Sequence, residues 1–127
     1  MRVLLTISLI TLTACTPRGT ITYAPEATRI GDVTPVFIGT TRVLDDGKFG
    51  PDRAETMRFA RYDISIPPNR TAGEINWPPR AAKPNPDRHF LTTHEELYPA
   101  ESNFRADLKR DLAAHGNEAV IFVHGYN

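Results

Sequence analysis

The chain has 127 residues, with 15 Lys and Arg against 15 Asp and Glu, so its formal net charge is zero. This length fits one small domain, and the balanced charge argues against a nucleic-acid-binding protein, which usually carries a basic face. A single cysteine excludes a disulfide framework and a thiolate zinc site. The hydrophobic share of 40% is ordinary for a globular protein and argues against wholesale disorder.

The first fifteen residues have the pattern of an export signal. Met1-Arg2 gives a positive start, and Val3–Leu12 is almost entirely apolar. This run is too short to cross a bilayer, which needs about 20 residues, but it matches the apolar core of a secretory signal peptide. It leads into Leu12-Thr13-Ala14-Cys15, which resembles the signal of bacterial lipoproteins: a branched residue, two small residues and a cysteine.

The lipoprotein resemblance implies a lipid anchor on Cys15. In that family the thiol receives a diacylglycerol and the peptidase then cuts before the cysteine, so residues 1–14 would be the signal peptide. The alternative is an ordinary secretory signal that ends in a free thiol. Acyl chains such as palmitate would hold the mature protein on a membrane. Thr16, in place of Asp, resembles outer-membrane sorting. We therefore expect an envelope lipoprotein that faces the periplasm, on the outer membrane in preference to the inner.

The middle of the chain predicts strands joined by turns. Residues 15–34 contain two prolines and two glycines without periodicity, which predicts a tether. Pro35–Gly39 is a short apolar run closed by glycine and predicts a first strand. Asp45-Asp46-Gly47 and Gly50-Pro51 have the composition of turns. Arg58–Ile66 alternates, with its apolar side chains at positions 62, 64 and 66 and the polar side chains of the opposite face at 61, 63 and 65. This pattern predicts a half-buried strand.

A proline-rich stretch follows the second strand. Seven of the eleven prolines lie between Pro67 and Pro99. The sequence predicts a long extended loop over residues 67–99, ordered where Ile75 and Trp77 reach apolar surface. A loop of that length is uncommon in a compact domain and is usually functional or disordered.

One amphipathic helix is predicted, over Asn103–His115. Phe104, Leu108 and Leu112 recur every four residues and mark the face that packs on the core. Ser102 is the expected N-cap, and Gly116 the expected stop.

The segment after this helix is continuously apolar. Ala119–Val123 shows no alternation, so it predicts a strand covered on both faces, as at the centre of a parallel sheet. A strand, a helix and a buried strand in succession predict a layered α/β domain over residues 35–127.

The candidate functional residues come directly after that segment. His124-Gly125-Tyr126-Asn127 would lie at the carboxyl end of a buried strand, where ligands bind in open α/β sheets. A glycine there lets the backbone turn and expose N–H groups, which an oxyanion hole requires. On the residues alone, a plain turn at the end of a strand remains the stronger interpretation of His124-Gly125.

Three segments in order resemble an esterase/lipase-like bacterial branch of the α/β-hydrolase superfamily. Residues 121–127, Ile-Phe-Val-His-Gly-Tyr-Asn, resemble its F-V-H-G-Y-N segment, and Gly39-Thr40-Thr41-Arg42 resembles its G-T-x-R element. Ser65-Ile66-Pro67-Pro68 followed by residues 73–78, Gly-Glu-Ile-Asn-Trp-Pro, resembles its S-I-P-P and G-E-I-x-x-P stretches. The match covers about Pro35 to Asn127.

The resemblance implies a role for the last residues. Backbone N–H groups of Tyr126, and of Gly125 and Asn127 beside it, would form part of the oxyanion hole. His124 would shape the loop and is not the catalytic base of the family. The superfamily nucleophile lies in G-x-S-x-G, followed by an acid and a histidine, and this sequence contains no such serine. We therefore expect an incomplete α/β-hydrolase sheet that stops before the nucleophile, inactive by itself, with a small carboxylic ester as substrate of the complete protein.

Other candidate sites have a stronger structural explanation. The four histidines lack the spacing of metal ligands, so no metal and no cofactor are expected. The neighbouring acids Asp45-Asp46 and Glu95-Glu96 indicate turn and surface chemistry. Arg42 could bind an anion, but a structural strand end is favoured. The alternative function is a non-catalytic envelope lipoprotein with a binding or scaffolding role.

Overall fold

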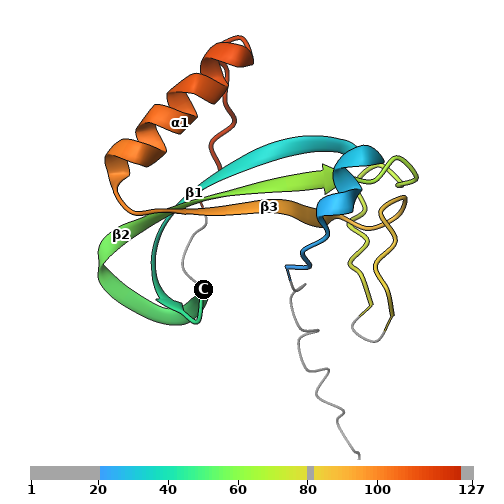
Figure 1. Cartoon of the computed structure of the whole chain (residues 1–127), viewed down its shortest axis with the longest axis horizontal. Helices are drawn as coiled ribbons and strands as arrows, with labels where there is room; N and C mark the ends of the chain where they lie inside the picture. The colour runs from blue at the N-terminus through green and yellow to red at the C-terminus, as the bar shows by residue number, and fades with distance from the viewer. Residues whose placement is uncertain (1–20, 80–81, 124–127) are drawn as a thin grey trace, which may run out of the picture.

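The computed structural model describes residues 21–79 and 82–123, which form a three-stranded antiparallel sheet with one helix on it (Figure 1). In chain order the elements are a short 3-10 helix η1 (Pro25–Arg29), β1 (Asp32–Asp45), β2 (Lys48–Ile66), β3 (Leu91–Tyr98) and α1 (Glu101–Ala114). The strand order is β1-β2-β3. The described chain thus combines a sheet and a helix.

The antiparallel sheet differs from the expected α/β-hydrolase sheet, which would be parallel. Each described strand pairs with its neighbour in sequence: β1 with β2, and β2 with β3. A parallel pair needs a crossover connection, usually a helix, whereas a tight turn gives an antiparallel pair. The described residues place their single α-helix after the third strand, so it joins no two of the strands.

The predicted turn at Asp45-Asp46-Gly47 is confirmed. Asp45 pairs with Lys48, and Asp46 and Gly47 have φ values of 45° and 73°. Two positive φ values at the centre of a two-residue loop are those of a type I′ turn, whose twist matches a hairpin. The predicted turn at Gly50-Pro51 is wrong, because both residues lie inside β2.

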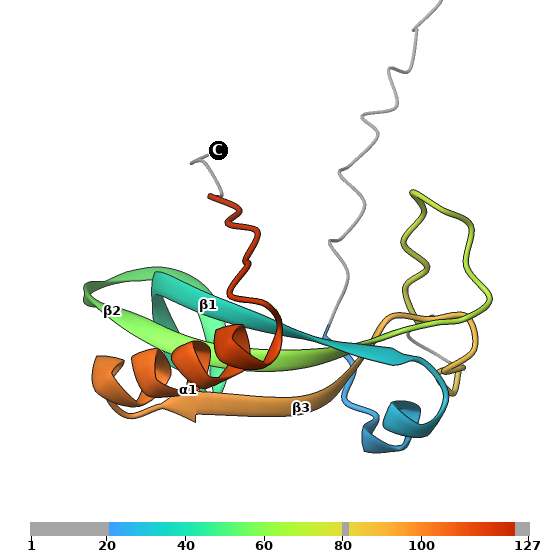
Figure 2. The same ribbon diagram turned by 90° about the horizontal axis from the view of Figure 1, so that it is seen from above.

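The first two predicted strands exist, and both are longer than predicted. Pro35–Gly39 lies within β1, and Arg58–Ile66 forms the last part of β2. Their register shifts twice near Arg42, between Thr40 and Arg42 and between Arg42 and Leu44. Such bulges bend a strand, and the hairpin curls away from the rest of the sheet (Figure 2).

The proline-rich segment contains a strand that the sequence analysis missed. β3 occupies the end of the predicted 67–99 loop, where Leu91, Thr92 and Thr93 are buried. Alternation of apolar and polar residues, the signal for a half-buried strand, is weak in Leu-Thr-Thr-His-Glu-Glu-Leu-Tyr. Ile75 and Trp77 were expected to reach apolar surface, but their side chains are 59% and 52% exposed.

The start of the described chain packs against β3. Residues 15–34 were predicted to form a tether, and within them Ala24 and Ala27 are buried in a cluster with Leu91. Tyr23 forms a parallel bridge with Thr92. The described core is small: its buried apolar residues are Ala24, Ala27, Ala60, Tyr62 and Leu91.

Helix α1 begins two residues before the predicted start and ends at Ala114. Ala100, in place of Ser102, is the N-cap, without a side-chain hydrogen bond. Gly116 (φ 76°) follows the C-cap His115 as predicted, and the N–H of Asn117 donates to the carbonyl of Leu112 at 2.8 Å. This bond is the 6→1 contact of a Schellman motif.

Phe104 joins α1 to all three strands. Its ring lies 4.7 Å from that of Phe59, 5.7 Å from Phe37 and 5.6 Å from Tyr98, measured between centroids. Edge-on and tilted aromatic pairs contribute about 0.5–1.5 kcal/mol each beyond burial. The predicted core-facing stripe of the helix is therefore confirmed at Phe104.

Gly31 packs tightly where β1 begins. A Cβ at this position would overlap the carbonyl oxygen of Ile66 and lie 2.9 Å from Ser65 Oγ. We expect Gly31→Ala to lower the free energy of unfolding by about 1–3 kcal/mol, as overpacking does. Gly50→Ala is the matched control, because its Cβ would be 3.7 Å from the nearest atom. Urea unfolding followed by circular dichroism measures both, and equal losses would contradict the packing argument.

Candidate functional site

The candidate residues of the sequence analysis lie outside the described residues. These are Cys15 and the four residues of the expected oxyanion turn, His124, Gly125, Tyr126 and Asn127. The structure describes the segment that leads into this turn, and the elements that precede it.

The predicted strand Ala119–Val123 is not formed. The chain after α1 has no strand pairing through Val123, and the side chains of Val120, Ile121, Phe122 and Val123 are 84–99% exposed. A strand buried on both faces requires neighbours beside it and layers above and below. Among the described residues, no strand pairs with this segment, so its composition alone did not determine its structure.

A cluster of charged side chains lies between α1 and the sheet. Arg61 of β2 bonds Asp63 through Nε at 2.7 Å and Asp107 of α1 through Nη1 at 3.1 Å. The hydroxyl of Tyr98 in β3 donates to Asp107 Oδ2 at 2.5 Å, and Arg110 Nη1 donates to Oδ1 at 2.6 Å. Asp107 therefore ties the helix to two strands, on the sheet face that the sequence analysis assigned to polar side chains.

The cluster shifts the pKa values of Asp107 and Tyr98 in opposite directions. Hydrogen bonds from Tyr98 and Arg61 lower the pKa of Asp107, even though burial acts in the opposite direction. Burial, with the hydrogen bond to Asp107, raises the pKa of Tyr98 well above its usual value. A general acid or base works best with a pKa near the operating pH. The pKa of Asp107 moves further below neutral pH, and the pKa of Tyr98 moves further above it. The cluster therefore fits a structural role in packing α1 on the sheet better than a role in proton transfer.

We expect Asp107→Asn to lower stability by about 2 kcal/mol at neutral pH, the scale of hydrogen bonds to a charged group. The folded state lowers the pKa of Asp107. This contribution is therefore fully present above the pKa of an unfolded aspartate, about 3.9, and is lost as the pH falls through the lower folded-state pKa. Urea unfolding as a function of pH measures it.

The matched control for Asp107→Asn is Asp52→Asn, which changes an exposed carboxylate in the hairpin. The wild type and this control should lose stability in acid, and Asp107→Asn should lose less. The same acid loss in all three chains would contradict a stabilising role for ionised Asp107.

Two residues from the segments that resemble the hydrolase branch, Arg42 and Ser65, have structural roles in the sheet. Arg42 Nη1 donates to the carbonyls of Gly50 and Pro51 at 3.2 and 3.1 Å, which holds the bent hairpin together. The hydroxyl of Ser65 is buried and donates to the carbonyl of Ala27 at 3.1 Å. These contacts give Arg42 a structural role in place of an anion site, but the predicted strand end is wrong, because Arg42 lies inside β1.

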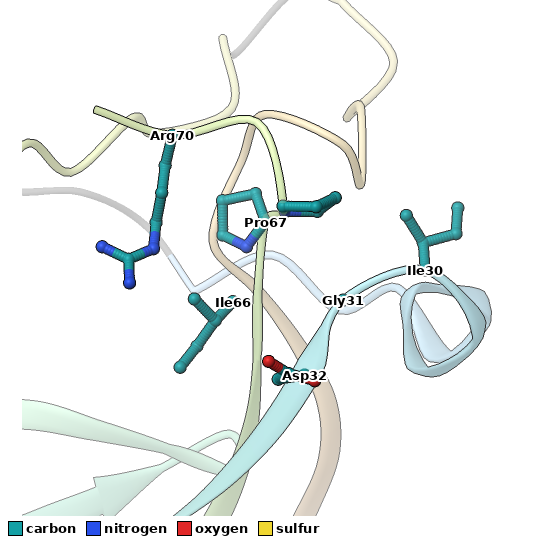
Figure 3. A pocket seen from close by; sticks show the side chains of 7 residues that line it. Ile30, Gly31, Asp32, Ile66, Pro67 and Arg70 are labelled. Atoms are coloured by element: carbon teal, nitrogen blue, oxygen red, sulfur yellow. The ribbon is translucent and has the colours of Figure 1, made fainter. Parts of the chain in front are cut away.

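A small hollow lies beside the Ser65–Pro68 segment (Figure 3). Its volume is about 240 Å³, and it is lined by Ile30, Gly31, Asp32, Ile66, Pro67, Pro68 and Arg70. Ligand pockets usually measure about 300–1,000 Å³, so this hollow is below the usual size of a ligand site.

A larger groove lies where α1 meets the curled hairpin. Its volume is about 820 Å³, and its apolar walls include Leu44 and Phe49 of the hairpin, Phe59, and Phe104 and Leu108 of α1. The apolar face of the helix, which includes Phe104 and Leu108, was predicted to pack on the core, and the groove was not predicted. The sequence contains no signal for the groove, because the bulges near Arg42 that bend the hairpin have no distinctive sequence pattern.

The described residues contain no group of three or more His, Cys, Asp or Glu side chains placed to hold a metal ion. They likewise include no helix with the length and hydropathy needed to cross a membrane.

Comparisons with protein-family models, with curated proteins and with solved structures found no match to this chain.

Proposed function

We propose that this chain is the amino-terminal part of a lipid-anchored serine hydrolase that acts on carboxylic esters. Cys15 carries the lipid on the periplasmic side of the envelope. The described sheet and helix form one edge of the domain, and the residues after Val123 form the oxyanion turn. The nucleophile, the acid and the histidine belong to sequence beyond Asn127, so this chain alone is inactive.

The observation that carries the proposal is the exposure of Val120–Val123. Four consecutive large apolar side chains in water are unfavourable, and each fully buried one would contribute about 1.5–3 kcal/mol. β-branched and aromatic residues of this kind favour strands. They immediately precede His124-Gly125-Tyr126-Asn127. The segment therefore has the composition of a buried strand that leads into a turn, in a structure whose described part leaves it uncovered.

The small described core supports the same proposal. Three of its five buried apolar residues are alanines. Small domains with little buried apolar area are only marginally stable. Further strands and helices packed on this sheet would supply the missing burial.

In the proposed reaction, a serine attacks the ester carbonyl and water then hydrolyses the acyl-enzyme. The negative charge develops on the former carbonyl oxygen, and backbone N–H groups at Gly125, Tyr126 and Asn127 are placed by the resemblance to stabilise it. This chain's contribution would thus be electrostatic, and it would hold no proton-transfer group of the triad.

The deciding experiment is to read the gene beyond the codon for Asn127 in all frames and to express the longest product. A G-x-S-x-G sequence there, with hydrolysis of p-nitrophenyl esters and labelling by a fluorophosphonate, supports the proposal. The 127-residue chain should show neither. A stop codon directly after Asn127, with good expression of the short chain, would favour the non-catalytic envelope lipoprotein instead.

A further inference from the structure

The two outer strands of the sheet differ in what lies beside them. β3 has the Tyr23–Thr92 bridge on its outer side, where Ala24 N–H donates to the Thr92 carbonyl at 2.8 Å and Thr92 N–H to the Thr22 carbonyl at 2.9 Å. β1 pairs with β2 on one side, and no other strand of the described chain pairs with it. An open edge of this kind accepts a further strand.

The segment after α1 lies on the β1 side of the sheet. Seen from above in Figure 2, the chain that follows the helix leaves its end toward β1 and away from β3. Val120–Val123 is free of charged side chains and more than four-fifths exposed. The open edge and a segment suited to pair with it are therefore on the same side of the molecule.

Chain direction and handedness both favour that edge. β1 and β3 run the same way, because each is antiparallel to β2. Helix α1 returns the chain along one face of the sheet, so a strand after it would run parallel to β3 and to β1. Seen with α1 in front, as in Figure 2, a crossover from β3 to the outer side of β1 is right-handed. About 98% of such connections are right-handed, and the outer edge of β3 would need a left-handed one.

We propose that the β1 edge is the docking site for residues 119–123 of the same chain, which add to it as a fourth, parallel strand. The inference rests on strand order and direction, and it does not require the hydrolase activity proposed above. A strand in this direction ends at the same end of the sheet as β3.

Pro35 indicates which backbone N–H groups of β1 point outward at the docking edge. It lies in register with Asp63, and a proline is tolerated in a strand where its missing N–H faces away from the paired neighbour. The outer side of β1 therefore lacks one donor, at Pro35. Backbone groups alternate in direction along a strand, so Val33 and Phe37 direct their N–H groups outward as well. The added strand loses one hydrogen bond at Pro35 and keeps those on either side.

The apolar groove is a poorer site for the same segment. Its helical wall is formed by Glu101, Phe104, Arg105 and Leu108, in the first half of α1. The segment leaves from the other end of a helix of 14 residues, which is about 21 Å long. The β1 edge is reached without reversing along the helix.

Hydrogen exchange measured by mass spectrometry on the full chain tests the proposal. In the wild type we expect amides of 119–123 to exchange at least about tenfold more slowly than in an unstructured peptide. Ile121→Pro removes an amide and breaks the strand. It should abolish this protection and speed exchange in peptides from 32–39, while peptides from β3 stay unchanged. Ile121→Val is the matched control and should behave as the wild type.

Three outcomes would overturn the proposal. Exchange of 119–123 at the unstructured rate in the wild type shows that no strand forms. Loss of protection in β3 peptides, in place of 32–39, assigns the segment to the other edge. Protection that appears only as the protein dimerises with concentration, measured by light scattering, assigns the edge to a second copy. None of these outcomes depends on esterase activity.

Discussion

Replacing Tyr126 by proline in the longer hydrolase proposed above is expected to lower kcat by about 100- to 1,000-fold, with KM close to its wild-type value. Proline has no backbone N–H, and removal of one oxyanion-hole donor costs about this much because the lost interaction is made only in the transition state. Steady-state hydrolysis of p-nitrophenyl esters by the product of the longer reading frame measures both constants.

The matched control is Tyr126→Phe, which keeps the backbone N–H and removes only the phenol hydroxyl. It should retain nearly full kcat if the backbone carries the role. A large loss in Tyr126→Phe, with a small one in Tyr126→Pro, would assign the contribution to the side chain and contradict the proposed turn. Fluorophosphonate labelling and circular dichroism check that each variant still folds.

Replacing Cys15 by alanine is expected to abolish labelling by fatty acid and to leave residues 1–14 on the chain, because in the lipoprotein family the peptidase cuts after the thiol has been lipidated. Without the thiol no thioether to diacylglycerol can form, and the acyl chains supply the membrane affinity. One chain gives only marginal, reversible binding, whereas two or more hold a protein stably. Growth with radioactive palmitate measures the label, and the mass of the chain shows whether residues 1–14 remain.

Thr16→Ser is the control for the Cys15 experiment, because it changes the neighbouring residue and leaves the thiol in place. Label and cleavage before Cys15 should persist in this variant. A Cys15→Ala protein that still carries radioactive acyl chains would contradict the lipoprotein assignment. An unlabelled wild type that is nevertheless exported would establish an ordinary signal peptide with a free thiol.

Local signals predicted the hairpin and helix well. Asp45-Asp46-Gly47 forms the turn because a type I′ loop requires positive φ at both central residues, which Gly and Asp tolerate. Phe104 lies on the packed face of α1, as its four-residue spacing with Leu108 predicts. Gly116 follows the helix in a left-handed conformation for the same local reason.

The sequence did not predict the features that depend on contacts between residues far apart in the chain. β3 has little alternation, and it is fixed by pairing with β2 and by the Ala24–Ala27 segment packed beside Leu91. Arg61 and Asp63 were assigned to a polar face, yet they bond each other and Asp107 beneath the helix. Charge alone does not distinguish a solvated side chain from one paired at an interface.

Within the candidate site, the sequence shows which residues are suited to a buried strand, but it did not predict the structure that they adopt. Ala119–Val123 has the residues of a buried strand, but a strand acquires its structure from its neighbours, and none of the described strands pairs with this segment. The groove between the hairpin and α1 depends on bulges near Arg42, whose positions are set by pairing with β2. No single-sequence pattern encodes either arrangement.

A sheet in which each strand pairs with the preceding one also determines an order of assembly. The β1–β2 hairpin closes through two residues, and β3 then adds to a strand that is already in place. Sequence-near contacts of this kind have low closure entropy and form quickly, whereas parallel pairing across a helix is slow. During synthesis, the hairpin can therefore form before the apolar segment after α1 has left the ribosome, so the β1 edge is complete before the segment proposed to pair with it is available.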